Sequence, residues 1–422
     1  MHKVFIKTFG CQMNEYDSGR MAGVLAATKN YLLTTSEEDA EFIIVNTCSV
    51  REHAENREYS YIGRHIKDKK IIVAGCMAQN LKEEIVQSFP KVFAVVGTFN
   101  FANIDAIIGK KQKQKLFVNE APDSYNIEPA RSDKYRAYVT IMQGCNNFCA
   151  YCIVPYVRGR ERSRTEKSII NELKTAAENG YKEVMLLGQN VNSYGLDNGC
   201  SFTKLLCDVE KINGIERIRF MTSHPKDLTE ALIETVAGSE KLCKHFHLPA
   251  QAGSDKILKA MNRKYTRSEY LNKVLNIRKK IPNVSVTTDI LVGFPGETKE
   301  DFKDTVSLMK AAGFDNSYVF KYSKRSGTKA AEMAETVSEK EKGERVNYIL
   351  DLQKKISGDI NKTYEGKTVE VLFTRENGKF AEGETDNFKH VKVAEGKGLL
   401  GSILPVKITS ARSLTLTGEV QK

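Results

Sequence analysis

Gly144-Cys-Asn-Asn-Phe-Cys-Ala-Tyr-Cys152 is the stretch that decides how this chain folds and what chemistry it carries. Its cysteines have the spacing Cys-x3-Cys-x2-Cys and directly follow a strand-like run, Tyr138 to Gln143. Three thiolates hold a four-iron cluster and leave one iron without a protein ligand, where a small molecule can bind. A structural zinc site needs four closed ligands, and no neighbouring cysteine or histidine supplies the fourth. The loop therefore predicts an iron–sulfur cluster with an open iron, held by Cys145, Cys149 and Cys152.

A second set of three cysteines, Cys11, Cys48 and Cys76, is spread along the amino-terminal part of the chain. Each follows a short strand-like run, and these runs alternate with helical stretches, as in an open, doubly wound parallel α/β sheet. The runs are Val4 to Thr8, Phe42 to Asn46, Ile71 to Gly75 and Val92 to Gly97. Ligands of such sheets collect outside the carboxyl ends of the strands, so we expect the three thiols to converge on a second cluster. The alternative is three unrelated buried thiols, because cysteine is common in protein cores.

From Tyr135 the alternation of strand and helix patterns restarts and runs longer. The expected strands are 138–143, 183–187, 217–221, 245–248, 285–291 and 317–322. Six units predict a partial (β/α)6 barrel, short of the eight that close a full one. Active sites on such scaffolds lie at the carboxyl ends of the strands. Polar residues gather there in this sequence, among them Gln189, Ser223, Gln251 and Ser254, followed by a turn that starts at Gly293.

The carboxyl-terminal part changes pattern after a charged amphipathic helix. Its expected stripe is Val346, Ile349, Gln353, Ile356 and Ile360. Short strands with glycine-rich turns follow at 368–374, 391–394, 406–409 and 414–416. They predict a small all-β, OB-like barrel, a common binder of single-stranded nucleic acid. The basic stretch 109–115 and the polar segment 120–134 are typical of a linker, with contact between the lysines and an RNA backbone as the alternative. We therefore expect domains at 1–116, 131–357 and 358–422.

The charge of the chain favours an acidic partner. Its 64 lysines and arginines against 53 acidic residues leave a formal charge of +11, and nucleic acid is the commonest partner of such proteins. Many metabolic enzymes carry a mild excess of lysine without one, so charge alone does not decide. The apolar runs are too short to span a bilayer, and the start of the chain lacks the pattern of a signal peptide. We expect a cytoplasmic protein without membrane contact, whose cysteines are metal or redox sites rather than disulfides.

The three-cysteine loop, with aromatic Tyr151 before its third cysteine, resembles the signature of radical S-adenosylmethionine enzymes. Together with the amino-terminal cysteines, the resemblance narrows to the methylthiotransferases, in which a cluster-binding domain precedes a radical core and a TRAM domain. Further segments carry it over essentially the whole chain: Thr8 to Asn14, Asn46 to Arg51, the tail of the loop to Arg164, Leu187 to Gly195, His247 to Ser254 and Thr288 to Glu297.

The resemblance implies a division of labour between two [4Fe-4S] clusters. Cys145, Cys149 and Cys152 would bind the radical cluster, and Cys11, Cys48 and Cys76 an auxiliary cluster that carries the sulfur to be inserted. S-adenosylmethionine would serve both as methyl donor and as radical source. The implied cofactor contacts are Gln189, Ser223, Gln251, Ser254 and Gly293, each of which is alternatively an ordinary loop cap.

The implied reaction is the methylthiolation of N6-(dimethylallyl)adenosine at position 37, next to the anticodon of tRNA. The implied partners are the tRNA anticodon stem-loop, an electron donor such as flavodoxin or ferredoxin, and a sulfur donor. One alternative is a sibling methylthiotransferase that acts on threonylcarbamoyladenosine in tRNA or on a ribosomal protein. Another is a non-catalytic iron–sulfur protein that binds RNA. Two open cysteine sets argue against the latter, because a purely structural site gains nothing from a vacant coordination position.

Several other residues admit two interpretations. The alternating Arg158, Arg160, Arg162 and Arg164 follow the radical loop, where guanidinium groups suit phosphates and carboxylates, although charge runs are commonly solvated. His224 and His247 lie near strand ends, where a bound adenosine or a protein core would equally place them. Cys200, Cys207 and Cys243 lack cluster spacing and are expected to be buried structural thiols.

Overall fold

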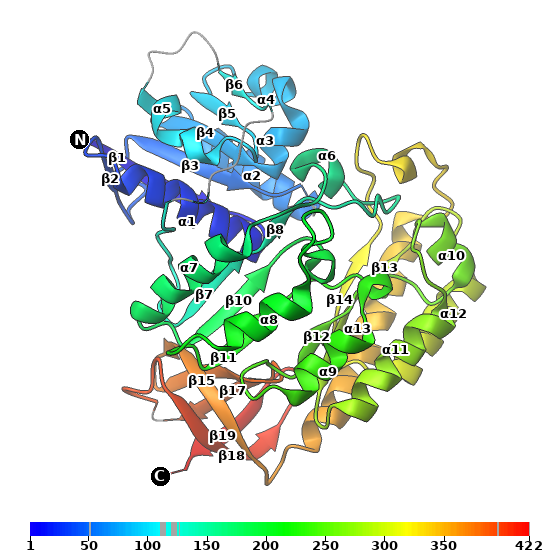
Figure 1. Ribbon diagram of the computed structural model, residues 1–422. Helices are drawn as coiled ribbons and strands as arrows, with labels where there is room; N and C mark the ends of the chain where they lie inside the picture. Colours follow the sequence, from blue (N-terminus) through cyan, green and yellow to red (C-terminus); the bar gives the residue numbers. More distant parts are fainter. Residues whose placement is uncertain (50–51, 110–114, 120–124, 126, 395, 422) are drawn as a thin grey trace. The chain divides into compact units, whose positions relative to one another are not determined.

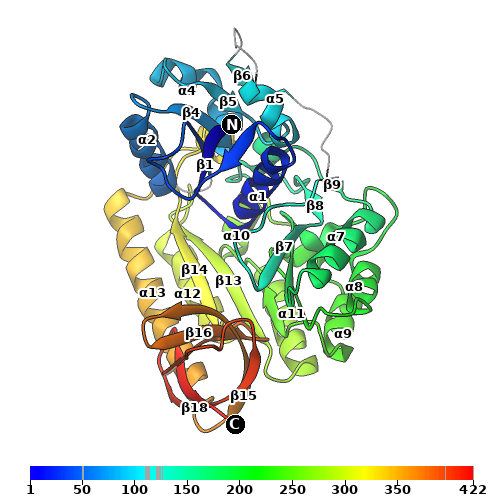
Figure 2. The same ribbon diagram turned by 90° about the vertical axis from the view of Figure 1, so that its left-hand side faces the viewer.

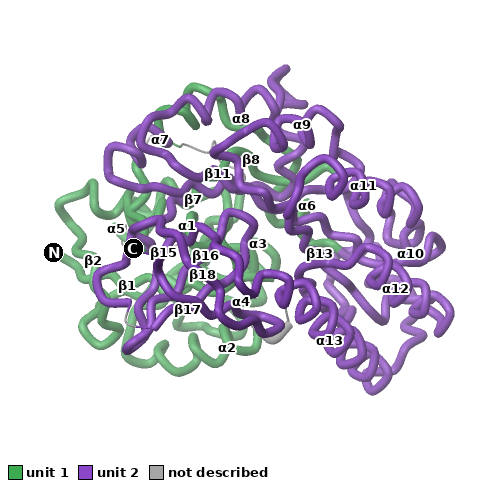
Figure 3. Tube along the Cα trace, turned by 90° about the horizontal axis from the view of Figure 1, so that it is seen from below, with its two compact units in different colours: residues 1–132, 138–146, 152–172 green, residues 133–137, 147–151, 173–422 purple. Residues whose placement is uncertain are grey.

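The computed structural model describes residues 1–422 except 50–51, 110–114, 120–124, 126, 395 and 422. For residues 52–54 it describes the backbone and not the side chains. The predicted linker lies partly outside the described residues. Two compact units make up the chain (Figure 3). The first comprises residues 1–132, 138–146 and 152–172, and the second comprises 133–137, 147–151 and 173–422. The domain boundaries expected from the sequence stay predictions.

The first unit is built on a six-stranded sheet of order β2-β1-β3-β4-β5-β6, in which every pair of neighbours is parallel. Its strands are β1 (His2–Thr8), β2 (Tyr31–Leu33), β3 (Phe42–Thr47), β4 (Lys70–Gly75), β5 (Ala94–Val96) and β6 (Leu116–Phe117). Its helices include α1 (Gln12–Ala26), α2 (Glu52–His65), α3 (Cys76–Leu81), α4 (Glu83–Ser88) and α5 (Ile104–Gly109). Figure 1 shows helices on both faces of this sheet.

Alternation along the central strands separates two apolar cores. Ile44 packs with residues of α1 and α5 on one face, whereas Ile43 and Val45 pack with residues of α2 and α3 on the other. Side chains of a strand point alternately to opposite faces, so a strand buried on both faces is apolar throughout. The predicted doubly wound sheet is confirmed. The short edge strands β2 and β6 were not predicted from the sequence, because three-residue and two-residue strands leave no period to detect.

The six strands predicted for the barrel are confirmed and form two three-stranded sheets, β11-β10-β7 and β12-β13-β14. They are β7 (Arg136–Thr140), β10 (Glu183–Leu187), β11 (Arg217–Phe220), β12 (His245–His247), β13 (Ser285–Val292) and β14 (Asn316–Lys321). The helices between them are α7 (Glu166–Glu178), α8 (Phe202–Glu210), α9 (Glu230–Gly238), α10 (Asp255–Ala260), α11 (Arg267–Lys280) and α12 (Lys299–Ala312). The stripe Ile169, Leu173 and Ala176 of α7 is fully buried, as its spacing predicts.

The predicted carboxyl-terminal barrel is also confirmed. Its five strands close in the order β15-β16-β17-β19-β18, and Figure 2 shows them forming a ring. They are β15 (Thr368–Asn377), β16 (Phe380–Thr385), β17 (His390–Ala394), β18 (Ile403–Ala411) and β19 (Leu416–Val420). β16 was missed because its inward positions are small residues. At Gly383 a Cβ would lie 2.1 Å from the carbonyl oxygen of Leu372, so only glycine fits there.

The helix α13 (Glu339–Lys362) precedes the barrel and differs from its predicted stripe. Of the expected stripe, Ile349 and Gln353 are buried, and the rest of the buried face is polar: Lys342, Arg345, Ser357 and Asn361. These groups have partners, since Arg345 pairs with buried Glu297, and Gln353 donates to the carbonyl oxygen of Phe314 at 2.8 Å. Buried polar groups are retained where hydrogen bonds satisfy them, which hydrophobic periodicity cannot reveal.

Within the second unit, buried charges join the barrel to β7, β10 and β11. Glu183 pairs with Arg136 and Arg219, while Arg217 and Arg219 donate to backbone carbonyls of β15, β16 and the turn at Asp386. Burial opposes ionisation of Glu183, but the arginines outweigh it and hold its pKa at about 2. The ionised carboxylate therefore compensates guanidinium charges that are themselves buried.

Across the described residues, every helix is too short or too polar to cross a membrane.

Candidate functional site

Cys11, Cys48 and Cys76 follow the carboxyl ends of β1, β3 and β4, which are neighbours in the sheet. The registers Thr8↔Asn46 and Thr47↔Gly75 bring the three chain ends to one edge. Cys48 and Cys76 are buried, whereas Cys11 is exposed. The strand ends therefore gather three residues that lie far apart in the sequence, as expected from the topology.

Two glycines make this gathering possible. Gly10 and Gly75 directly precede Cys11 and Cys76 and have φ angles of +115° and +96°, which L side chains rarely adopt. A Cβ on Gly10 would lie 3.0 Å from the Cβ of Cys48, and one on Gly75 would lie 2.5 Å from Asn46 Oδ1. The crowding shows how closely the three loops approach one another at this edge.

Asn14, in the first turn of α1, ties these loops together. Its Nδ2 donates to the carbonyl oxygens of Phe9 and Thr47 at 2.7 and 2.9 Å. Its Oδ1 accepts from the Cys11 thiol at 3.7 Å. On the other side, the backbone N–H of Cys48 donates to Glu58 Oε1 at 2.9 Å. Asn14 and Glu58 thus hold the backbone around the cysteines from two helices.

Three cysteine thiols are ligands of the kind that hold a four-iron cluster. Among the described residues, no three His, Cys, Asp or Glu side chains are arranged to hold one ion. A four-iron cluster binds each cysteine through a different iron, so its ligands stand further apart than those of one ion. Burial raises the pKa of the Cys76 thiol, and the nearby Arg158 guanidinium partly offsets that rise. A positive group beside the thiols favours the thiolate form that ligates iron.

The three-cysteine loop 144–152, called the radical loop below, starts from two paired antiparallel strands, β8 (Met142–Gln143) and β9 (Arg162–Ser163). The Cys145 N–H donates to the Gly159 carbonyl at 3.1 Å. Gly144 has φ +84°, and a Cβ there would lie 2.1 Å from the Arg160 carbonyl oxygen. The glycine before the first cysteine is therefore required by close backbone contact, as at Gly75, whereas Gly10 is crowded by the side chains of Asn14 and Cys48.

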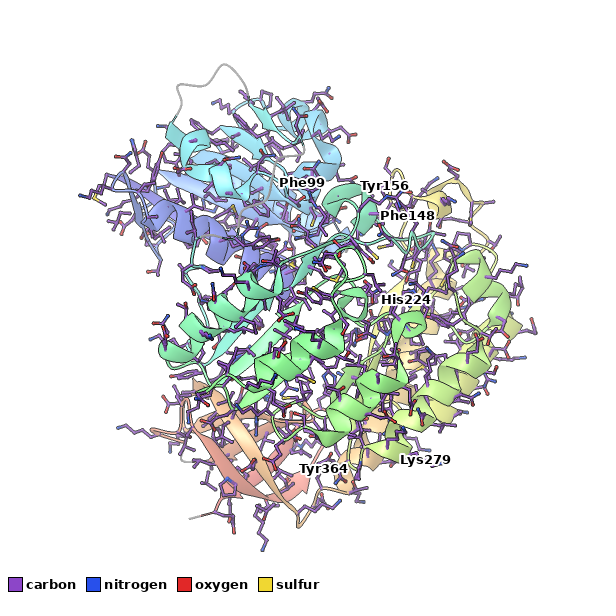
Figure 4. All side chains as sticks on the ribbon, in the orientation of Figure 1. Phe99, Phe148, Tyr156, His224, Lys279 and Tyr364 are labelled. Carbon is purple, nitrogen blue, oxygen red and sulfur yellow. The ribbon has the colours of Figure 1, made fainter. Side chains whose placement is uncertain are left out.

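The middle of the loop is held by the segment after α10. Asn262 Nδ2 donates to the carbonyls of Asn147 and Phe148 at 3.2 and 2.9 Å, and the Ala150 N–H donates to the Met261 carbonyl at 2.9 Å. Phe148, labelled in Figure 4, has a φ of +47°. A left-handed backbone at a bulky residue is costly and persists only where the surroundings enforce it.

Arg263 is a site residue that sequence reasoning missed. Its Nη1 donates to Cys149 Sγ at 3.3 Å, its Nη2 to the Pro249 carbonyl at 2.8 Å and its Nε to Tyr265 Oη at 2.7 Å. The side chain is buried. Nothing in its neighbourhood in the sequence distinguishes it from the many other basic residues, because its partners come from segments that only the fold brings together.

His224, labelled in Figure 4, lies against Tyr265, with ring centroids 5.7 Å apart. Its Nδ1 accepts from the Lys226 N–H at 3.2 Å, and its Nε2 is buried without a partner among the described residues. Burial, assisted by the positive charge of Arg263, lowers its pKa to about 2. The ring is therefore neutral, and with Nδ1 accepting, Nε2 carries the proton and faces no acceptor.

The residues predicted to contact the cofactor make different interactions within the protein. Ser254 caps α10 and donates to Asp301 Oδ1 at 2.6 Å, and Ser223 donates to Asn192 Oδ1 at 3.0 Å. At Gly293 a Cβ would lie 2.4 Å from Lys342 Cγ. Gln251 has a φ of +70° and pairs through its backbone with β13. Each has a structural role, and their contact with a cofactor stays a prediction, as does that of Gln189.

The four arginines after the loop divide into two pairs. Arg158 and Arg164 are buried and bind Asp17 and Glu172 at 2.7 and 2.6 Å, whereas Arg160 and Arg162 are exposed. Among the remaining cysteines, Cys243 is buried and Cys200 half-buried. The expectation that Cys207 is buried was wrong: α8 buries its neighbours Leu205 and Leu206 and turns Cys207 to solvent.

Comparisons with known proteins agree with this geometry. Residues 139–309 match the model of the Radical SAM superfamily. A radical S-adenosylmethionine methyltransferase, TsrM from Kitasatospora setae, has a similar fold, with a TM-score of 0.57 over 78% of this chain and 74% of that one at 13% identity. The cobalamin-dependent S-adenosylmethionine radical enzyme OxsB gives a TM-score of 0.55 over 84% of this chain and 56% of that one at 11% identity. The fold and the three-cysteine loop define a radical S-adenosylmethionine enzyme, a class that uses a [4Fe-4S] cluster and S-adenosylmethionine.

Relatives that align over nearly the whole chain identify a family within the radical S-adenosylmethionine enzymes. Residues 3–97 match the uncharacterized protein family UPF0004. The tRNA-2-methylthio-N(6)-dimethylallyladenosine synthase of Acetivibrio thermocellus is 45% identical over 98% of this chain and 90% of its own length. That of Desulforamulus reducens is 46% identical over 98% and 94%, respectively. The chain belongs to this family and is a radical SAM tRNA methylthiotransferase.

Proposed function

We propose that the protein methylthiolates N6-(dimethylallyl)adenosine at position 37 of tRNA, giving 2-methylthio-N6-(dimethylallyl)adenosine. The observation that carries the proposal is the presence of two separate three-cysteine sets, one in the radical loop and one at the edge of the amino-terminal sheet. A radical enzyme that only cleaves its cofactor needs one set. A second set gives it a place to hold the sulfur that becomes part of the product.

The radical set is Cys145, Cys149 and Cys152, and the auxiliary set is Cys11, Cys48 and Cys76. When bound, a cluster with an open iron anchors S-adenosylmethionine and supplies the electron for its cleavage, while a second S-adenosylmethionine provides the methyl group. The protein supports the radical set through Arg263, which donates to the Cys149 sulfur, and through the clamps on residues 147, 148 and 150. Gln189, Ser223, Gln251, Ser254 and Gly293 are the proposed cofactor contacts.

The proposed substrate is an anticodon stem-loop held by the carboxyl-terminal barrel, the TRAM domain of the predicted 358–422. Phe380 is 39% exposed, and Lys392 lies 3.8 Å from the centre of its ring. An exposed ring with adjacent positive charge offers a base a stacking surface and its phosphate a partner. Chemistry on C2 of adenine requires the base to leave its stack, which costs less in a loop than in a duplex. A cytoplasmic location, an electron donor such as flavodoxin or ferredoxin, and a sulfur donor complete the proposal.

The ion pairs of the arginines that follow the radical loop favour a dimethylallyl group over a threonylcarbamoyl group on the substrate. A threonylcarbamoyl carboxylate requires a free cation where it is buried. Arg158, Arg160, Arg162 and Arg164 were the candidates for that role. The two buried ones, Arg158 and Arg164, already bind carboxylates within the first unit, and the other two are exposed to solvent.

The decisive experiment is a competition between the two modified anticodon stem-loops on the anaerobically reconstituted enzyme, with products measured by mass spectrometry of nucleosides. We expect methylthiolation of the dimethylallyl form and about eight irons per chain, from two clusters. Preferential reaction of the threonylcarbamoyl form would move the protein to the sibling activity. Iron and cofactor cleavage without product from either stem-loop would contradict a tRNA substrate of this kind.

A further inference from the structure

Arg158 is the last residue of α6 (Val154–Arg158), a short helix that packs against Cys76, one of the three auxiliary cysteines. Ile153 and Val157 form a small buried cluster with Cys76. Thr98 Oγ1 donates to the Val157 carbonyl at 2.5 Å and ties the helix to the loop after β5. The position of Arg158 relative to Cys76 is therefore fixed from two sides within the first unit.

The guanidinium of Arg158 is buried but only partly satisfied. Its Nη2 donates to Asp17 Oδ2 at 2.7 Å and to Asn14 Oδ1 at 3.3 Å. Its Nη1 is buried and finds no acceptor with hydrogen-bond geometry among the described residues. Leaving a buried donor unpaired is costly, and more so for a charged group. Such an unpaired group in a well-packed core calls for an explanation.

The neighbours of Arg158 supply that explanation. Asn14 Oδ1 accepts both from Arg158 Nη2 at 3.3 Å and from the Cys11 thiol at 3.7 Å, and Cys76 packs against Val157, the residue before Arg158. The guanidinium thus lies within electrostatic reach of two of the three auxiliary thiols. A four-iron core with three thiolates carries net negative charge, and hydrogen bonds to its sulfurs help to set its reduction potential.

We propose that Arg158 is a positioning residue of the auxiliary cluster, whose Nη1 donates to sulfur at Cys76 and whose charge stabilises the cluster's more negative, reduced state. This inference rests on the proposed function, which places a cluster on Cys11, Cys48 and Cys76. Removal of the guanidinium shifts the reduction potential of that cluster to more negative values. It also weakens the retention of iron, because groups that support metal ligands contribute to affinity.

A purely structural role predicts something different. If Arg158 only neutralises Asp17, removing both charges together restores the site, because breaking one partner of a buried pair is what costs stability. Arg164 provides the matched control. It is equally buried on the same segment, where it binds Glu172 and donates to the Thr140 carbonyl at 2.7 Å and to Ser168 Oγ at 2.9 Å.

The test uses the full chain with Cys145, Cys149 and Cys152 replaced by alanine, so that only the auxiliary cluster contributes to the spectra. Into this parent we introduce Arg158→Gln with Asp17→Asn, Arg158→Lys, and the control Arg164→Gln with Glu172→Gln. Iron retention against a chelator and the potential of the cluster, followed by electron paramagnetic resonance, are measured after circular dichroism confirms folding.

We expect the Arg158/Asp17 double variant to lose iron about 10- to 100-fold faster than the parent and to have a more negative potential. Arg158→Lys should fall between them, because lysine keeps the charge and loses the planar fork. The Arg164/Glu172 control should match the parent. A double variant with the parent's potential and iron retention overturns the inference while leaving the proposed function intact. A parent that binds no iron at the auxiliary cysteines overturns both.

Discussion

The two sets of three cysteines differ in how the fold brings their members together. Cys145, Cys149 and Cys152 lie on one loop, held by backbone hydrogen bonds to Gly159 and Met261 and by the side chain of Asn262. Cys11, Cys48 and Cys76 come from three separate strand ends and meet only because β1, β3 and β4 are neighbours in register. A local site depends on a few turns, whereas a distributed site depends on an entire sheet. The auxiliary site should therefore be the more sensitive of the two to changes in packing.

The largest effect is expected when either set of three cysteines is replaced by alanine, because each set should be needed for a different step of the reaction. Alanine at Cys145, Cys149 and Cys152 together should abolish reductive cleavage of S-adenosylmethionine and remove one cluster. Alanine at Cys11, Cys48 and Cys76 should leave cleavage measurable and abolish methylthio product. Chromatography of 5′-deoxyadenosine and of the modified nucleoside checks both results. Equal loss of cleavage in the two triple variants would refute the division of labour.

Arg263 tests the radical set in the same way that Arg158 tests the auxiliary set. Arg263→Gln removes the donor to Cys149 Sγ and should weaken iron binding at the radical loop about 10- to 100-fold. The auxiliary cluster should be retained, since the contacts of Arg263 lie in the second unit. Iron analysis of the variant, in the presence and absence of the auxiliary cysteines, distinguishes the sites. Loss of iron from the auxiliary site alone would show that the two sets are not supported separately.

Glycine substitutions measure how tightly the loops pack at the edge of the sheet that carries Cys11, Cys48 and Cys76. Gly75→Ala adds a Cβ 2.5 Å from Asn46 Oδ1 at a φ of +96°, whereas Gly180→Ala meets nothing within 4 Å at a φ of +84°. Both suffer backbone strain of about 1–2 kcal/mol, and only Gly75→Ala adds overpacking of about 1–3 kcal/mol. Denaturant unfolding should show the larger loss for Gly75→Ala, together with loss of auxiliary iron. Equal losses in both variants would mean that the strand ends have room to separate.

The smallest effect at neutral pH is expected at His224. Its folded pKa of about 2 lies below the ordinary value of 6.5, so the unfolded chain binds a proton more readily. The stability that this residue contributes is complete above pH 6.5 and is lost as the pH falls below it. His224→Gln should therefore change stability little at pH 7 and reduce the acid sensitivity between pH 6 and 4. Unfolding midpoints across that range are the measurement, and an unchanged pH slope would contradict it.

The sequence by itself determined the elements whose signal is local. The spacing of Cys145, Cys149 and Cys152, the strand before each auxiliary cysteine and four of the five strands of the final barrel can be predicted from adjacent residues. Their placement follows from rules of strand connection that apply to any parallel sheet. The same reasoning missed β2, β6 and β16, because very short strands and strands with small inward residues have no apolar period.

Tertiary structure alone decided which groups support the sites. Arg158, Arg160, Arg162 and Arg164 are equivalent in the sequence, yet two are buried ion-pair partners and two face solvent. Arg263 meets Cys149 only through the packing of the segment after α10 against the loop. The buried polar face of α13 was hidden for the same reason. A charged or polar side chain is stable in a core only if partners from distant segments satisfy it, and the identity of those partners exists only in the folded chain.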